Sequence, residues 1–219
     1  WSMSASGLAA VWAKENTREE IFAAFQRKEV YATTGPRIRL QMFASWKFPE
    51  QAAKAVNIGQ IGYAYGVPMG GDLMRSEQAG APEFLLRAVK DPVGANLDRV
   101  QMIKGWVDAD GSQHEKIYNV VWSAGRKIDS EGSLAMVGDT VDRTTGNYQN
   151  TIGASELATI WFDPDFDDQQ HAFYYARVLQ IPTARHSMYD AIALQTEQQN
   201  MGKSVIQERA YSSPIWYTP

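Results

Sequence analysis

The chain has 219 residues, a formal net charge of −4 at pH 7 and no cysteine. This length favours one large domain or two small ones, and the lack of cysteine excludes disulfides, thiolate zinc sites, iron–sulfur clusters and cysteine catalysis. The negative charge argues against a nucleic-acid partner held through phosphate contacts. No apolar run reaches about 20 residues, so we expect no membrane insertion.

The N-terminal stretch "WSMSASGLAA" lacks the basic and long apolar regions of a signal peptide. It begins with Trp1 rather than methionine. We therefore expect the chain to be a fragment of a longer protein whose missing segment could hold the chemistry.

The first predicted element is a helix over residues 18–28. Thr17 and Glu20 form a capping box, and Ile21, Phe22 and Phe25 give the helix an apolar face. The run "VYATTG" then predicts a short strand that ends at a Gly-Pro turn. Alternation of apolar and polar residues in "RIRLQMFASW" predicts a second, half-buried strand.

The middle of the chain is rich in glycine and proline from residue 48 to residue 82, with a short helix expected near residues 51–56. Strands are predicted farther on, the clearest being a hairpin around "DADGSQ". The expected strands are residues 83–91, 99–107, 116–123, 156–163 and 171–181, with a short strand in 124–150, a helix over 187–199 and a closing strand at "IWY". The pattern predicts a mainly β protein with a few helices, of the α+β class, whose β-sandwich-like body follows one capped helix and strand.

Carboxylates are concentrated in the loop "FDPDFDDQQH". Asp163, Asp165, Asp167 and Asp168 are the candidate ligands for a calcium or magnesium ion, because both ions prefer oxygen ligands. An exposed loop between strands, with aspartates that cap turns, has the same composition, and we favour this second interpretation.

Other motifs give weaker signals. The segment "VDADGSQHE" begins like a calcium loop, but position twelve is Asn119, so we expect an ordinary hairpin turn. His114, His171 and His186 show no metal-binding spacing, and there is no nucleophile elbow. No residue is therefore assigned a catalytic role.

Several long motifs resemble a large bacterial family of proteins of unknown function. They are "TREEIFAAFQRKEVYATTGPRIRLQMF", "GVPMGGDL", "RVQMIKGWVDADG", "AFYYARVLQIPTARHSMYDA" and "QERAYSSPIWYTP". Full-length members of that family resemble metal-dependent hydrolases of the PHP type, that is, polymerase and histidinol phosphatase-like proteins. The resemblance covers essentially the whole chain.

The resemblance implies a parent protein whose upstream part carries histidine and aspartate ligands for a divalent metal, which activates water for hydrolysis, often of phosphoesters. Residues 1–36 would then end the catalytic domain, and residues 37–219 would form a β-rich C-terminal domain. The implied partner is the missing N-terminal catalytic portion, and the favoured location of the parent is the periplasm or another extracytoplasmic compartment. No cofactor is expected in this segment itself.

Thr33, Thr34 and Arg37 are the candidate substrate-binding residues, since they surround the turn that would lie beside the catalytic domain. Arginine suits phosphate or carboxylate groups. The alternative is that Arg37 lies on the solvent face of a strand and that the threonines are simply β-formers.

Two functions of different class follow. The first is the C-terminal segment of a metal-dependent hydrolase, inactive alone. The alternative is a non-catalytic β-domain that binds carbohydrate or the neighbouring domain, or that only stabilises it. Exposure of Trp46, Trp106, Trp122 or Trp161 would favour a ligand platform, and burial of all four would oppose it.

Overall fold

The computed structural model describes residues 6–77, 80–123, 125–196 and 204–219. The elements of the first half are β1 (Leu8–Val11), α1 (Arg18–Gln26), β2 (Val30–Thr33), β3 (Arg39–Ser45), the 3₁₀ helix η1 (Ala52–Lys54), α2 (Ile58–Tyr65), β4 (Val67–Pro68), β5 (Asp72–Met74) and β6 (Glu83–Val89). Those of the second half are β7 (Leu97–Val107), β8 (Gln113–Trp122), β9 (Glu156–Phe162), β10 (Ala172–Gln180), β11 (Thr183–Ala184), α3 (His186–Leu194), β12 (Val205–Ile206), β13 (Arg209–Ser212) and β14 (Ile215–Thr218). The predicted mainly β, α+β class is confirmed.

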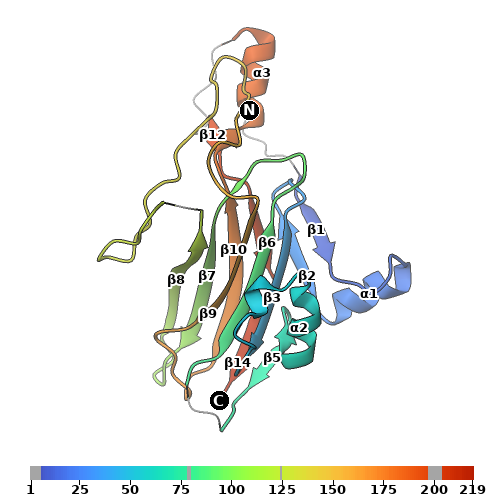
Figure 1. Cartoon of the computed structure of the whole chain (residues 1–219), viewed down its shortest axis with the longest axis vertical. Coiled ribbons are helices and arrows are strands. Elements are labelled where there is room, and N and C mark those ends of the chain that lie inside the picture. Colours follow the sequence, from blue (N-terminus) through green and yellow to red (C-terminus); the bar gives the residue numbers. More distant parts are fainter. Residues whose placement is uncertain (1–5, 78–79, 124, 197–203) are drawn as a thin grey trace.

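Two sheets face each other, with the smaller sheet in front of the larger one in Figure 1. The smaller sheet has the order β4-β3-β6-β9. In the larger sheet, β10 pairs along its length with β7, which pairs with β8, and on its other edge with β13 and then β14. β13 leads on to β2 and β1, and β14 to β5.

The core lies between the sheets, because each sheet turns alternate apolar side chains toward the other. Leu40 and Phe84 of the smaller sheet and Tyr174 and Val178 of the larger one are all buried in one cluster. The rings of Phe84 and Tyr174 have centroids 4.6 Å apart. The opposite face of β10 is therefore the outer face of the larger sheet.

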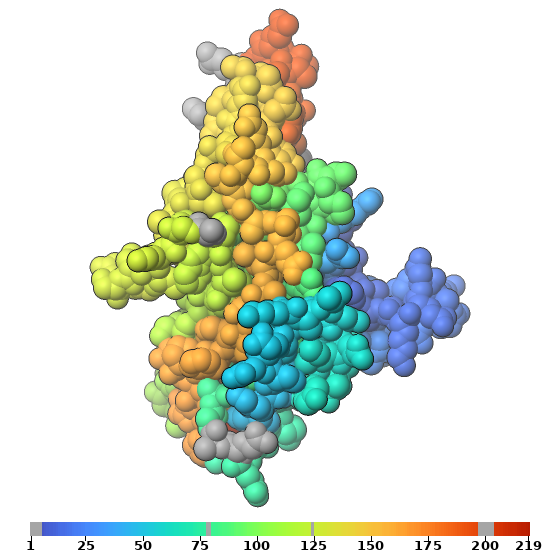
Figure 2. Space-filling view, viewed as in Figure 1, coloured from blue at the N-terminus to red at the C-terminus, as the bar shows by residue number. Residues whose placement is uncertain are grey.

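The predicted capped helix is confirmed as α1. The hydroxyl of Thr17 accepts a hydrogen bond from the backbone N–H of Glu20 at 3.3 Å. The helix projects sideways from the sandwich (Figures 1 and 2), and its phenylalanines Phe22 and Phe25 are 62% and 48% exposed. The two rings leave this face of α1 uncovered.

Residues 1–36 are joined to the remainder of the chain by backbone pairing. Strand β2 pairs antiparallel with β13, with Thr33 opposite Ala210. The N-terminal strands and the C-terminal strands therefore share one sheet. The division into domains at residues 36 and 37 stays a prediction.

Three local expectations need correction. Residues 51–56 hold only the short η1, whereas a full helix, α2, lies in the stretch that was expected to be a loop. The segment 125–150 contains an isolated bridge between Ile128 and Leu134 and, within the described residues, no strand. The helix expected over 187–199 ends at Leu194, and residues 197–199 lie outside the described ranges.

Candidate functional site

A cavity of about 360 Å³ lies where β2 ends and α3 begins. We call it the threonine pocket, and it is lined by Gly7, Thr33, Thr34, Arg185, His186, Ile206 and Glu208. Its walls come from β1 and β2 at one end of the chain and from the β11–α3–β12 region at the other. Pairing of β2 with β13 brings these distant segments together.

The hydroxyl of Thr34 is held firmly. It donates a short hydrogen bond to the carboxylate of Glu208 and accepts one from the backbone N–H of Arg209 at 2.8 Å. The backbone N–H of Thr34 also donates to the carbonyl of Arg209 at 3.0 Å. Thr34 therefore fixes the position of the Glu208 carboxylate at the pocket wall.

Two glycines shape the pocket. A side chain at Gly7 would put its Cβ 2.4 Å from the carbonyl oxygen of Thr33, so only glycine fits there. Gly35, in the turn after the threonines, has φ 145°, a backbone conformation that other residues avoid. Its N–H donates to the Thr33 hydroxyl at 3.3 Å. The "TTG" turn is thus built for this one arrangement.

The polar groups of the threonine pocket suit the binding of a ligand better than nucleophilic catalysis. Arg185 and His186 provide nitrogen donors, and His186 opens helix α3, whose first backbone N–H groups carry partial positive charge. Glu208 provides an acceptor. Within the described residues, neither threonine hydroxyl donates a hydrogen bond to His186, as a nucleophile activated by that histidine would. The pocket can hold and orient an anionic group and a hydroxyl.

Arg37, the third predicted substrate-binding residue, is separate from this pocket. Its side chain is exposed and is not among the lining residues. Its backbone N–H donates to the carboxylate of Asp91 at 2.7 Å, and the N–H of Val93 donates to the other oxygen at 3.1 Å. The hydrogen bond from Arg37 lowers the pKa of Asp91 below its ordinary value. The structure therefore brings Thr33 and Thr34 together but not Arg37.

The four aspartates predicted as metal ligands have different surroundings. Asp163 is buried and pairs with the equally buried Lys104, with 2.6 Å between Nζ and Oδ2. The Tyr174 hydroxyl donates to the same oxygen at 2.8 Å. Burial and the nearby Asp163 charge raise the pKa of Tyr174, so this hydroxyl remains a donor.

Asp165 and Asp168 each form an ion pair with a basic side chain. Lys116 pairs with Asp165, and the Tyr118 hydroxyl donates to it at 2.7 Å. The hydrogen bond from Lys116 lowers the pKa of Asp165 below its usual range. Arg75 forms an ion pair with Asp168 at 2.7 Å, and both residues line a cavity of about 1050 Å³ together with Asp167.

No metal centre is built by these side chains. Within the described residues, no three histidine, aspartate or glutamate side chains are grouped so that they could hold an ion. A metal at Asp163, Asp165, Asp167 and Asp168 stays a prediction, which the contacts to Lys104, Lys116 and Arg75 disfavour.

Sequence comparison places residues 1–219 within the family described as "Protein of unknown function (DUF3604)". The chain belongs to this family. Searches of curated proteins and of solved structures find no match. The DUF3604 match includes both halves of the threonine pocket, so the pocket is made entirely from the shared domain. None of the helices in the described part of this domain is long and apolar enough to cross a membrane.

Two polar clusters of the DUF3604 domain were not expected from its sequence. Across the β7–β8 hairpin, His114 lies 2.6 Å from Asp108 and stacks on Trp106 with ring centroids 5.1 Å apart. The cross-strand register of a hairpin could have predicted this contact, because Trp106 pairs directly with His114. Nothing in the sequence links Arg185, His186 and Glu208 to the threonines.

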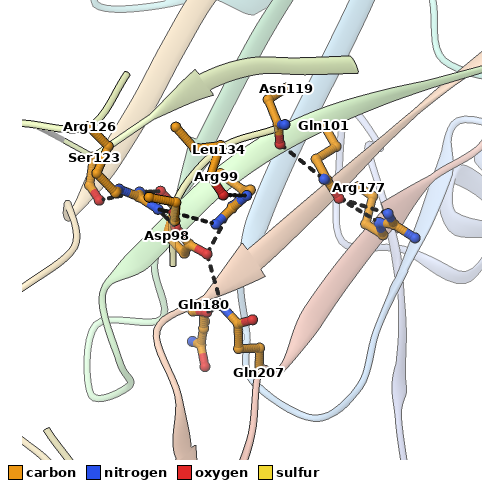
Figure 3. A network of polar contacts seen from close by, with 11 residues as sticks. Asp98, Arg99, Gln101, Asn119, Ser123, Arg126, Leu134, Arg177, Gln180 and Gln207 are labelled. Carbon is orange, nitrogen blue, oxygen red and sulfur yellow. Dashed lines mark hydrogen bonds and ion pairs between the residues drawn. The ribbon is translucent and has the colours of Figure 1, made fainter. Parts of the chain in front are cut away.

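The second cluster surrounds Asp98, which is only 1% exposed (Figure 3). Arg99 and Arg126 pair with its carboxylate at 3.0 and 2.7 Å, and the Gln207 amide donates to it at 2.9 Å. Arg99 and Arg126 also donate to the carbonyl of Ala135. These contacts tie the segment after β8 to the larger sheet, which is a structural role.

Four tryptophans were to favour a ligand platform if exposed and to oppose one if buried. They are neither freely exposed nor fully buried. Trp46, Trp106, Trp122 and Trp161 are all half-buried. The indole N–H groups of Trp46, Trp106 and Trp122 donate to protein oxygens, and Trp161 packs between Phe84 and Tyr118. They do not form a shared platform, whereas Trp216, on β14, is 43% exposed.

Proposed function

We propose that the chain is the C-terminal segment of a metal-dependent hydrolase and that its threonine pocket holds the substrate. Phosphoesters are the proposed substrate class. One observation carries the proposal: Thr33 and Thr34 meet Arg185, His186 and Glu208 in one cavity, although they come from opposite ends of the chain. The likeness of the surrounding motifs to PHP-type proteins supplies the reaction class by analogy.

Each group in the pocket has a distinct role under this proposal. The Arg185 guanidinium and the start of α3 attract a phosphoryl group through charge and backbone N–H groups. The carboxylate of Glu208, which is held by Thr34, accepts a hydrogen bond from a substrate hydroxyl. The metal and its bound water, supplied by the catalytic portion, would carry out the hydrolysis. The chain alone is then inactive.

Helix α1 offers a surface to which the catalytic portion could bind. It projects from the sandwich (Figure 2), and Phe22 and Phe25 present apolar rings to solvent. The proposed catalytic portion of the same protein would cover these rings. Covering both would remove roughly 200 Å² of apolar surface from water, which stabilises the contact by about 5 kcal/mol before the costs of association.

The test uses the full product of the gene that encodes this chain. Hydrolysis of p-nitrophenyl phosphate and bis(p-nitrophenyl) phosphate is measured with Mn²⁺ for the wild type, Thr34→Val and His186→Ala. We expect kcat/KM to fall about tenfold or more in both variants, because Thr34→Val releases the Glu208 carboxylate and His186→Ala removes an imidazole donor from the pocket. Thr151→Val, at an exposed threonine, is the matched control and should leave kcat/KM unchanged.

Two results would overturn the proposal in different ways. Absence of hydrolysis with both esters would remove the hydrolase assignment. Hydrolysis with unchanged kcat/KM in Thr34→Val and His186→Ala would keep the enzyme but take the substrate out of the threonine pocket.

A further inference from the structure

A second cavity, of about 650 Å³, lies on the outer face of the larger sheet, near the start of β10. We call it the aromatic cavity. The side chains that matter for its chemistry are Gln113, Glu115, His171, Phe173, Trp216 and Thr218. It is distinct from the threonine pocket, which shares none of these residues.

The floor of the aromatic cavity is one row of directly paired residues across four strands. Trp216 of β14 pairs with Phe173 of β10, Phe173 with Gly105 of β7, and Gly105 with Glu115 of β8. Directly paired residues point to the same face of a sheet. Two aromatic rings and a carboxylate therefore surround a position that has no side chain.

Gly105 lets the Phe173 ring lie low on the sheet. A Cβ on Gly105 would be 2.3 Å from Phe173 Cζ, so the ring occupies the space above the glycine. Trp216 leans beside it, with ring centroids 5.2 Å apart and planes at 51°. The result is an aromatic surface at the bottom of a hollow, and Trp216 is 43% exposed.

Polar side chains surround this surface with unused hydrogen-bonding capacity. Within the described ranges, the side chains of Gln113, Glu115, His171 and Thr218 make no hydrogen bond or ion pair with another residue. An amide, a carboxylate, an imidazole and a hydroxyl together offer both donors and acceptors. This mixture suits a neutral ligand with many hydroxyl groups, whereas a cationic ligand would need acceptors alone.

We propose that the aromatic cavity binds a sugar ring of a neutral carbohydrate chain. The C–H face of the sugar stacks on Phe173 and against Trp216, because ring faces favour partly positive hydrogens. The hydroxyls at the edge of the sugar exchange hydrogen bonds with Gln113, Glu115 and His171. An apolar floor with a few polar groups at its edge is the general form of a small-ligand site.

The test is calorimetric titration of the chain with cellohexaose, xylohexaose, mannohexaose and chitohexaose. At least one should bind, and Trp216→Ala should weaken it about fivefold or more, which is the lower end of the loss that removal of a stacked aromatic ring causes. Gln113→Ala, at an exposed residue that leaves the floor intact, should weaken it several-fold. Tyr65→Ala, at a tyrosine 57% exposed on α2, is the matched control and should not change the affinity.

Melting temperatures of all variants are compared, so that a loss of affinity is attributed to the site only where the variant remains folded. The proposal is overturned if none of the four sugars binds, or if binding survives unchanged in Trp216→Ala and Gln113→Ala. Binding of tetramethylammonium, lost in Trp216→Ala, without binding of any sugar would also overturn it, because it would identify a cation site.

Discussion

At the scale of single residues, Lys104 and Asp163 form a buried ion pair. Their side chains are 3% and 0% exposed, and their charged atoms are 2.6 Å apart. The Lys104 ammonium also lies 5.1 Å from the centre of the Trp106 ring. Such a pair contributes less than its Coulomb attraction, because both ions lose their hydration, but breaking it leaves one charge buried and unpaired.

Lys104→Met should therefore lower the free energy of unfolding by about 3–5 kcal/mol. Adding Asp163→Asn, which removes the stranded charge and keeps an acceptor for Tyr174, should restore much of the loss. Lys116→Met is the matched control, because its partner Asp165 is half exposed, and it should cost no more than about 1 kcal/mol. Urea unfolding measures all three, and equal losses in Lys104→Met and Lys116→Met would contradict the account.

Asp91 gives the chain a predictable response to acid. Its pKa lies below the ordinary 3.8, chiefly because the Arg37 N–H donates to its carboxylate. A group with a lowered folded-state pKa adds stability above its unfolded pKa, and that stability is lost as pH falls through the folded pKa. The contribution of Asp91 is therefore full above pH 3.8 and fades below it.

Asp91→Asn should consequently be less stable than the wild type at pH about 6, and the difference should shrink as pH falls toward about 2.5. The measurement is the free energy of unfolding in denaturant at several pH values in this range. A difference that is the same at every pH would show that ionised Asp91 does not stabilise the fold.

At the scale of elements, Arg126 fastens the long segment after β8 to the sandwich. Its guanidinium pairs with Asp98 and donates to the carbonyls of Asp98 and Ala135 (Figure 3). The segment has no strand of its own within the described residues. Near Ala135 it is held by Arg126 and by Arg99, which donates to the carbonyls of Leu134 and Ala135.

Arg126→Ala should lower the free energy of unfolding by about 3 kcal/mol, because buried Asp98 loses one of its two cations. It should also speed amide hydrogen exchange in residues 127–136 more than in β7 or β10. Arg143→Ala removes only a half-exposed pair with Asp139 and serves as the control. Uniform exchange throughout Arg126→Ala would argue against a local tether.

Local chemistry explains which elements the sequence could predict. The Thr17–Glu20 cap predicted α1, and alternation with an Asp-Gly turn predicted the β7–β8 hairpin. Helix α2 escaped prediction because its glycines are poor helix formers. The packing of α2 explains the glycine at position 62. A Cβ on Gly62 would lie 2.3 Å from the Phe43 ring, so the helix needs glycine at that contact.

At the scale of the whole molecule, the candidate site depends on contacts that no local pattern encodes. Thr33 and Thr34 were predicted from their turn, but Glu208 lies 174 positions from Thr34 and meets it only because β2 pairs with β13. Arg37 was grouped with the threonines by nearness in sequence, and the strand direction after the turn carries it away. The aromatic cavity likewise requires the order of β14, β10, β7 and β8 in the larger sheet.

The proposed function divides the work between two parts of one protein. In this proposal, the chain supplies the threonine pocket and the catalytic portion supplies the metal. The most direct test of that division is the metal content of the purified protein. The chain and the full gene product are each produced in a medium that contains Mn²⁺, Zn²⁺ and Fe²⁺, and their bound metal is measured side by side by mass spectrometry. We predict one or more equivalents of metal in the gene product and far less than one in the chain. About one equivalent of transition metal bound to the chain alone would contradict the account.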